Sequence, residues 1–204
     1  MIIRDLKPID IEAMVKVHQE AFPDYFSTAF GRSYLRILYA SFVTTPDCVA
    51  VGAFQDGHLA GFAVGHTNWS RYFSKMINRY WFKLVVIVCH KFMTSSGFRK
   101  GIRSRLNYVS FALNPFGRRK YTQAHSTCPN RLVSLAVHPS FRRQGVAAQV
   151  VDHFCERMAS LRAKTVGLSV FLDNVTAINF YFRTGWVIEK MTNNALYFIR
   201  HLAR

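Results

Sequence analysis

The segment Leu135-Ala136-Val137-His138-Pro139-Ser140-Phe141-Arg142-Arg143-Gln144-Gly145-Val146-Ala147 places an apolar strand end, a turn and a helix start in direct succession. The first backbone N–H groups of a helix have no partner inside it, so an anion such as a pyrophosphate suits the position above them. Gly145 lets a ligand approach the backbone, and the small side chain of Ala147 leaves space for it above the first helical turn. Arg142 and Arg143 add positive charge. The turn predicts a phosphate-binding site, with a plain helix start beside two surface arginines as the alternative.

The segments on either side of the turn alternate between strand and helix patterns. We expect strands over residues 131–137, 165–171, 186–191 and 196–202, and helices over residues 145–162 and 174–184. The apolar side chains of the longer helix that should face inward are Val146, Val150, Phe154, Met158 and Leu161. An alternation of this kind predicts a mixed α/β sheet.

The first 66 residues carry a simpler pattern. A short strand over residues 2–6 precedes a helix that begins after Pro8 and Asp10, carries His18 on its inward stripe and ends near Pro23. A second helix fits residues 31–43. Two apolar runs, 49–54 and 59–64, are separated by Gln55-Asp56-Gly57-His58, and Asp-Gly between such runs predicts a hairpin.

Residues 67–126 differ from the rest of the chain in charge. They hold 12 Lys or Arg and no Asp or Glu, so 12 of the 16 net positive charges lie in this one segment. Arg71, Lys75, Arg79 and Lys83 recur every four residues, which predicts a basic amphipathic helix. The apolar run 81–93 is shorter than the roughly 20 residues that cross a bilayer. A second basic cluster lies between predicted loops and contains Arg99, Lys100, Arg103 and Arg105.

Two motifs together resemble a known family. Arg142-x-x-Gly145-x-Ala147 is similar to the pyrophosphate loop of the GNAT N-acetyltransferase superfamily. Asn174-x-x-Ala177-x-x-Phe180-Tyr181-x-x-x-Gly185-Trp186, about 30 residues downstream, resembles the family's second hallmark. The resemblance implies one GNAT domain over residues 1–204: an acceptor-side half (1–66), a mostly helical basic insertion between the third and fourth strands (67–126) and an acetyl-CoA-binding half (127–204). The central mixed sheet should have about six or seven strands flanked by helices.

The resemblance also implies roles for individual residues. Main-chain groups of the strand end, Leu135, Ala136 and Val137, would meet the pantetheine arm of acetyl-CoA. The residues that would surround the pyrophosphate are Arg142, Arg143, Gln144, Gly145, Val146 and Ala147. Asn174 would contact the cofactor, and Tyr181 would protonate the departing thiolate as the general acid. A structural alternative for Tyr181 is an aromatic side chain that anchors helix to sheet. No metal is implied.

The base that removes the ammonium proton is less clearly marked. Family members often place Glu or His on the strand before the pyrophosphate loop, whereas this strand offers Arg131, Val133 and Ser134. Three residues elsewhere border the acceptor side in such folds and are candidates: Glu20, Asp24 and His66. We take Glu20 or Asp24 as the candidate base.

Partners and compartment follow from charge and composition. The expected reaction moves an acetyl group from acetyl-CoA to a primary amine of a small molecule or protein. The insertion could hold a phosphate-bearing acceptor such as a nucleotide- or lipid-linked amino sugar, lie on an anionic membrane, or be a solvated basic face. A GNAT fold without activity that binds nucleic acid or membrane is the alternative, although no nucleic-acid motif is present. A homodimer is compatible with the pattern.

The N-terminus and the cysteines bear on the compartment. Met1-Ile2-Ile3-Arg4-Asp5-Leu6 does not resemble a secretory signal, which favours the cytoplasm, with the inner membrane surface as a peripheral location. The four cysteines are widely spaced and suggest neither a zinc site nor a disulfide framework.

Overall fold

The computed structural model describes residues 1–94 and 128–202. Its centre is a seven-stranded sheet with the order β1-β2-β3-β4-β5-β7-β6. The strands are β1 (Ile2–Asp5), β2 (Cys48–Gln55), β3 (His58–His66), β4 (Arg131–Val137), β5 (Thr165–Phe171), β6 (Val187–Met191) and β7 (Ala195–His201). All neighbouring strands are antiparallel except β4 and β5, which are parallel. The predicted mixed sheet is confirmed.

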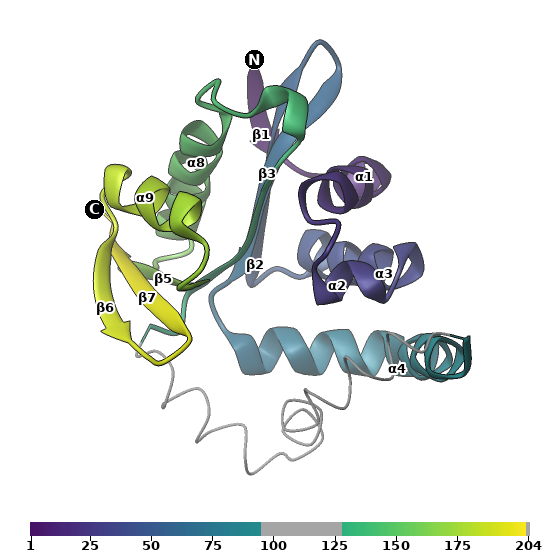
Figure 1. Cartoon of the computed structure of the whole chain (residues 1–204). Helices are drawn as coiled ribbons and strands as arrows, with labels where there is room; N and C mark the ends of the chain where they lie inside the picture. Colours follow the sequence, from purple (N-terminus) through teal and green to yellow (C-terminus); the bar gives the residue numbers. More distant parts are fainter. Residues whose placement is uncertain (95–127, 203–204) are drawn as a thin grey trace.

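Helices cover both faces of the sheet (Figure 1). On one face lie α1 (Ile11–Ala21), α2 (Phe26–Ala29), α3 (Arg32–Thr44) and α4 (Trp69–Thr94), and on the other lie α8 (Val146–Ser160) and α9 (Val175–Arg183). Two single 3-10 turns, η1 (Pro8–Asp10) and η2 (Pro139–Phe141), precede α1 and α8. The short α2 is not indicated by the sequence pattern.

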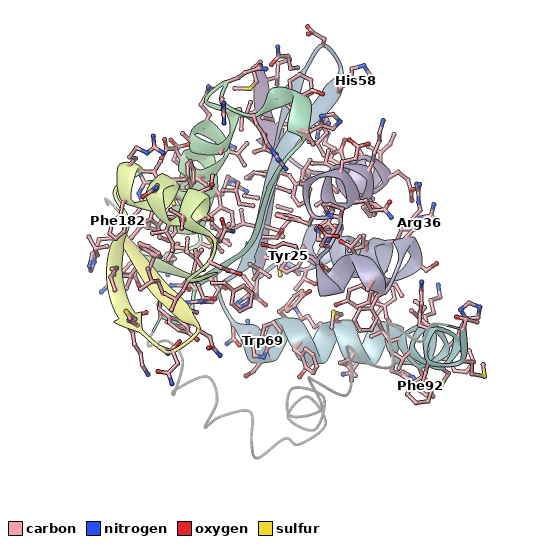
Figure 2. The ribbon with its side chains drawn as sticks, viewed as in Figure 1. Tyr25, Arg36, His58, Trp69, Phe92 and Phe182 are labelled. Atoms are coloured by element: carbon pink, nitrogen blue, oxygen red, sulfur yellow. The ribbon has the colours of Figure 1, made fainter. Side chains whose placement is uncertain are left out.

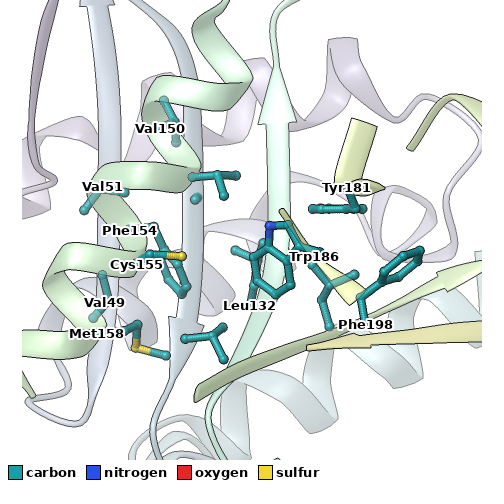
Figure 3. Packing of buried hydrophobic residues seen from close by; sticks show 14 of the residues in the cluster. Val49, Val51, Leu132, Val150, Phe154, Cys155, Met158, Tyr181, Trp186 and Phe198 are labelled. Carbon is teal, nitrogen blue, oxygen red and sulfur yellow. The ribbon is translucent and has the colours of Figure 1, made fainter. Parts of the chain in front are cut away.

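Each face has its own hydrophobic core. The core under α8 and α9 is built around Phe154, Trp186 and Phe198, whose side chains are at most 1% exposed. Figure 3 shows these side chains packed between α8 and the strands. The core under α1 and α3 includes Tyr39 and Phe62, whose rings meet edge to face at 5.0 Å. The sheet is therefore buried on both sides, which fixes the positions of the strand ends where the site is formed.

The predicted turn between β2 and β3 is present. Asp56 and Gly57 both have positive φ, 50° and 78°, as a two-residue hairpin turn with the strand twist requires. One expectation in the second half is wrong. Leu161 was expected to face inward, but α8 ends at Ser160, and Leu161 caps the helix with 40% of its surface exposed.

The described part of the insertion is the 26-residue helix α4 between β3 and β4. Its first half packs through Tyr72 and Met76, and the Tyr72 ring stacks on Phe42 of α3 at 4.5 Å. Arg71 and Lys75 form ion pairs with the same residue, Asp47, at 3.1 and 3.6 Å, so one of the two positive charges is compensated locally. The second basic cluster, residues 99–105, lies outside the described residues. None of the described helices is long and apolar enough to cross a membrane.

Candidate active site

The central feature of the site is a split in the sheet between β4 and β5. Their pairing is confined to Arg131 and Gly167, where the Gly167 N–H donates to the Asn130 carbonyl at 2.8 Å. Beyond that point β4 stays paired with β3 as far as Val137, whereas β5 continues along β7. Figure 1 shows β5, β6 and β7 turning away from the long strands β2 and β3. The split leaves one edge of β4 without a strand partner among the described residues.

The hydrogen-bond pattern between β3 and β4 shows which backbone N–H and C=O groups of β4 face the split. The His138 N–H donates to the Ala60 carbonyl at 2.9 Å, so His138 faces β3. Because backbone groups alternate along a strand, Ala136 also faces β3, while Leu135 and Val137 face the opening. Ala136 pairs with Phe62 of β3 and is 1% exposed. Of the three strand-end residues named from the resemblance, Leu135 and Val137 therefore present main-chain groups to the split.

The loop after β4 leads directly to the N-terminus of α8. Arg143 and Gly145 have positive φ values of 62° and 78°, and Gly145 is the N-cap of the helix. No side chain caps α8. The Gln144 side chain donates to the Ser140 carbonyl at 2.9 Å, and Val146 anchors the first turn with 2% exposure. The first N–H groups of the helix thus stay available to an anion.

Arg142 ties the loop to its surroundings. Its Nε donates to the Val137 carbonyl at 3.4 Å, and its Nη2 donates to the Ala21 carbonyl at the end of α1 at 3.3 Å. Neutral carbonyl partners leave the guanidinium charge uncompensated, so Arg142 adds positive potential to the loop. The neighbouring Arg143 and Ala147 are exposed and half-buried, respectively.

The second motif lies across the split on α9. Asn174 is the N-cap of this helix, and its side chain accepts from the Ala177 N–H at 3.1 Å. Tyr181 is 7% exposed, and its ring meets Trp186 and Phe198 at centroid distances of 5.5 and 5.9 Å. Burial, with a smaller contribution from Tyr25, raises the pKa of Tyr181 above its usual value. The phenol therefore stays protonated at neutral pH.

Tyr25 is a site residue that the sequence did not reveal. It lies in the connection between α1 and α2, is 44% exposed, and packs against Phe22 at 4.7 Å. After burial, Tyr25 is the second cause of the raised pKa of Tyr181. Figure 2 places Tyr25 between these helices and the strands.

The three candidate bases lie in different environments. The Nε2–H of His138 donates to the Glu20 carboxylate, next to the pyrophosphate-type loop, because the Nδ1 of the same ring accepts from the Ser140 N–H. Asp24 is exposed in the connection after α1. His66 is 2% exposed at the end of β3, and its Nδ1 has no hydrogen-bond partner among the described residues. Burial and the charge of Arg131 lower the pKa of His66 to about 4.

A buried polar network lies between α1, α2 and α3. His18 of α1 is hydrogen-bonded through Nδ1 to the Tyr39 hydroxyl and through Nε2 to Ser27 at 3.1 Å. Burial raises the pKa of Tyr39, and Ser134 of β4 acts on that pKa in the opposite direction. The only sequence signal for this network was a histidine within the apolar stripe of a helix.

Residues 109–186 match the model of the Acetyltransferase (GNAT) family. The matched residues include β4, the loop, α8 and α9, so this part of the chain is similar to that family. Within residues 1–94 and 128–202, no group of three or more His, Cys, Asp or Glu could hold a metal ion.

Solved structures with the same fold cover almost the whole chain. SsHAT matches with a TM-score of 0.68 and 18% sequence identity, over 100% of this chain and 98% of that chain. Aminoglycoside 6'-acetyltransferase type Ii matches with a TM-score of 0.61 and 14% identity, over 100% and 99% of the two chains. PaiA N-acetyltransferase from Thermoplasma acidophilum, in complex with coenzyme A, matches with a TM-score of 0.59 and 14% identity, over 98% of each chain. At such identities the likeness concerns the fold. No curated protein matches the sequence.

Proposed function

We propose that this protein transfers an acetyl group from acetyl-CoA to a primary amine by direct attack within a ternary complex. The observation that carries the proposal is the unpaired edge of β4, which begins after Arg131 and ends at the open N-terminus of α8. An extended pantetheine arm can add to that edge as a short strand would. Its pyrophosphate then meets the N–H groups of the loop. The coenzyme A complex of PaiA N-acetyltransferase supports the same use of the fold.

Each group of residues around the split has its own role in the proposed reaction. Leu135 and Val137 hydrogen-bond to the pantetheine arm, and the loop residues 142–147 surround the pyrophosphate. Asn174 contacts the cofactor near the pantetheine with the side-chain N–H₂ that the helix cap leaves available. The amine attacks the thioester carbonyl, the tetrahedral intermediate expels the thiolate, and Tyr181 donates its proton to the sulfur. Burial raises the pKa of Tyr181, which keeps the phenol protonated before the step but makes it a weaker acid than a free phenol.

The sequence-derived candidate bases, Glu20 and Asp24, differ in what surrounds them. The Glu20 carboxylate accepts a hydrogen bond from His138 on the loop side, which favours a role in holding the loop against α1. Asp24 lies one residue before Tyr25, which contributes to the raised pKa of Tyr181, so its carboxylate remains a candidate acceptor for the amine proton.

A thiol-release assay tests the proposed reaction directly. We expect free coenzyme A to appear when the protein is mixed with acetyl-CoA and one of a panel of amino sugars, amino acids, polyamines and peptides. The control is the same panel without acceptor, which measures hydrolysis. Absence of acetyl-CoA binding at tens of micromolar in isothermal titration, together with no thiol release, would refute the enzyme assignment.

A phosphate-bearing acceptor, including a lipid-linked or nucleotide-linked amino sugar, is the substrate class that the insertion favours. A cavity of about 460 Å³ lies between the C-terminal part of α3 and α4. Its walls carry hydroxyls and cations, among them Ser41, Thr44, Thr45, Lys75 and Arg79. Lys75 already pairs with Asp47, so Arg79 is the cation that remains for a phosphate. The acceptor panel therefore includes amino sugars with and without a phosphate group.

Association with an anionic membrane is a second proposal for the insertion. The distal half of α4 exposes large apolar side chains: Trp81 at 58%, Phe82 at 64%, Val85 at 51%, Val86 at 50% and Val88 at 38%. Figure 2 shows this helix running from Trp69 beside the sheet to Phe92 at its far end. The same half carries Lys83 and Lys91 and no acid. Exposed apolar side chains flanked by cations suit an anionic lipid surface.

Vesicle co-sedimentation tests the membrane proposal. We expect the protein to pellet with vesicles that contain phosphatidylglycerol and to stay in solution with phosphatidylcholine alone. The double variant Trp81→Ala/Phe82→Ala should lose most of this binding, because it removes apolar area from the lipid-facing side. The matched control is Val187→Ala/Ile188→Ala, which truncates exposed apolar side chains on β6. Equal recovery with neutral and anionic vesicles would contradict the proposal.

The alternative function is a GNAT-fold protein without activity that binds nucleic acid or membrane through residues 67–126. A salt-dependent shift with single-stranded nucleic acid in the absence of acetyl-CoA binding would favour it. We also propose a cytoplasmic location and a homodimer formed across β1, β6 or the insertion. Sedimentation equilibrium of the full chain measures the oligomeric state.

A further inference from the structure

The side chain of Arg142 has hydrogen-bond partners on two separate parts of the fold. Its Nε donates to the Val137 carbonyl at 3.4 Å, and its Nη2 donates to the Ala21 carbonyl at 3.3 Å. Val137 ends β4, and Ala21 ends α1. In Figure 1 the connection from β4 to α8 crosses the end of the sheet, between α8 on one face and α1 on the other. One guanidinium therefore joins this connection to the ends of a strand and a helix.

The Val137 carbonyl belongs to the unpaired edge of β4. The N–H of the next residue, His138, donates to the Ala60 carbonyl of β3 at 2.9 Å, so the C=O of Val137 points away from β3. A pantetheine arm that adds to this edge as a strand would donate an amide N–H to that carbonyl. In the structure the Nε–H of Arg142 takes this position. The side chain thus occupies part of the edge that the proposed donor needs.

Both contacts of Arg142 are weak for a guanidinium. Their distances are longer than the roughly 2.9 Å that is most common for N–H···O bonds, and the side chain is exposed to solvent. The two acceptors are neutral carbonyls, although the one at the end of α1 carries part of the helix dipole. Hydrogen bonds from arginine to a phosphate are shorter and about twice as strong as those between neutral groups. A pyrophosphate at the N-terminus of α8 therefore competes successfully for this side chain.

The connection from β4 to α8 does not depend on the two contacts of Arg142 for its shape. The Gln144 side chain donates to the Ser140 carbonyl at 2.9 Å, and the Ser140 N–H donates to Nδ1 of His138 at 3.2 Å. The Nε2–H of His138 donates in turn to the Glu20 carboxylate of α1. A guanidinium that leaves both carbonyls therefore leaves the backbone of the connection in place and still tied to α1.

We propose that Arg142 is a latch on the donor site: it covers the Val137 carbonyl until a pyrophosphate draws the guanidinium toward α8. The proposal rests on the donor binding proposed above. The positive charge of Arg142 already belongs to the pyrophosphate site, and the further point is that the same side chain closes the neighbouring site for the pantetheine arm. Pyrophosphate and pantetheine should therefore assist each other's binding. A thioester of pantetheine alone has no group that moves the latch, so the latch selects coenzyme A thioesters as donors.

Isothermal titration of the wild-type protein with pantetheine tests the latch directly. We expect saturating inorganic pyrophosphate to tighten pantetheine binding by about two- to tenfold, the effect of one net hydrogen bond. Pantetheine should tighten pyrophosphate binding by the same factor, because coupling between two ligands is reciprocal. The control contains sodium chloride at the ionic strength of the pyrophosphate solution. A pantetheine Kd that pyrophosphate leaves unchanged or raises would overturn the latch.

The substitution Arg142→Met removes the latch and keeps the length of the side chain. We expect it to tighten pantetheine binding by about two- to tenfold and to abolish the effect of pyrophosphate on pantetheine, while coenzyme A binds about tenfold more weakly. The matched control is Arg143→Met, which removes the same charge from the same loop, whereas both carbonyl contacts come from Arg142. It should weaken coenzyme A binding without tightening that of pantetheine. Equal changes in the pantetheine Kd of the two variants would contradict the proposal.

The latch and the acetyl transfer fail in different ways. A wild-type protein that binds coenzyme A and releases thiol, but shows no coupling between pyrophosphate and pantetheine, overturns the latch alone. Coupling in a protein that acetylates no amine of the panel supports the latch and contradicts the transfer. A protein that binds neither coenzyme A nor pantetheine overturns both. The coupling experiment uses the wild type, so this outcome does not depend on how well either variant folds.

Discussion

Replacement of Tyr181 by phenylalanine is expected to lower kcat by about 10²- to 10³-fold, with KM for acetyl-CoA unchanged. General acid catalysis by a positioned side chain contributes about 10²- to 10⁴-fold, and a thiolate is a comparatively good leaving group, which places the loss toward the lower end. The ring of Tyr181 packs on Trp186 and Phe198, and phenylalanine preserves these contacts. The measurement is steady-state thiol release at saturating acceptor.

The deficit of Tyr181→Phe should not depend on pH. Burial raises the pKa of Tyr181 above its usual value, so the phenol stays protonated through the assay range. The deficit should therefore be constant between pH 7 and pH 9.5. Tyr72→Phe serves as the control for loss of a buried hydroxyl, because Tyr72 is buried and its hydroxyl contacts Ser41 at 3.0 Å. Turnover equal to that of the wild type would leave Tyr181 as an anchor between α9 and the sheet.

Local patterns in the sequence were sufficient for most of the fold. The Asp56-Gly57 turn, the Gly145 helix start and the Asn174 cap each depend on a few adjacent residues, and each is present in the structure. The strand and helix periodicities also gave the order of elements, because both faces of the sheet are buried and each element has an apolar side. The end of α8 was missed by two residues, since Leu161 follows the same apolar spacing although the helix has already ended at Ser160.

The parts of the site that depend on tertiary contacts could not be predicted in this way. The split after Arg131 is a relation between β4 and β5, and neither strand alone indicates where their pairing stops. The hydrogen bonds of His18 with Tyr39 and Ser27 join side chains of α1, α2 and α3 that no local pattern brings together. The sequence predicts the basic stripe of α4 but does not indicate that Arg71 and Lys75 share an ion-pair partner, Asp47, which precedes β2. Charge periodicity on one helix contains no information about such a partner.

The substitution Gly145→Asp is expected to weaken acetyl-CoA binding by more than about a hundredfold. A carboxylate about 5 Å from one pyrophosphate charge, at an effective dielectric constant of about 20, costs about 3 kcal/mol. That free energy corresponds to a factor of more than a hundred in Kd. Aspartate tolerates the positive φ of 78° at this position better than most residues, so the fold should be kept. Isothermal titration with coenzyme A measures the change.

Two controls separate charge from backbone strain in this experiment. Gly145→Asn places a neutral side chain of the same shape at the same φ, and we expect it to weaken binding less than about tenfold. Gly57→Asp introduces the same residue at the same φ of 78°, in the β2–β3 turn where an added Cβ meets nothing within 4 Å. It should lower Tm as Gly145→Asp does and leave coenzyme A binding unchanged. The Gly145→Asp deficit should also shrink as salt is raised, because the repulsion is screened. Equal weakening by aspartate and asparagine would mean that the loop recognises shape alone, and its role as a pyrophosphate site would then fail.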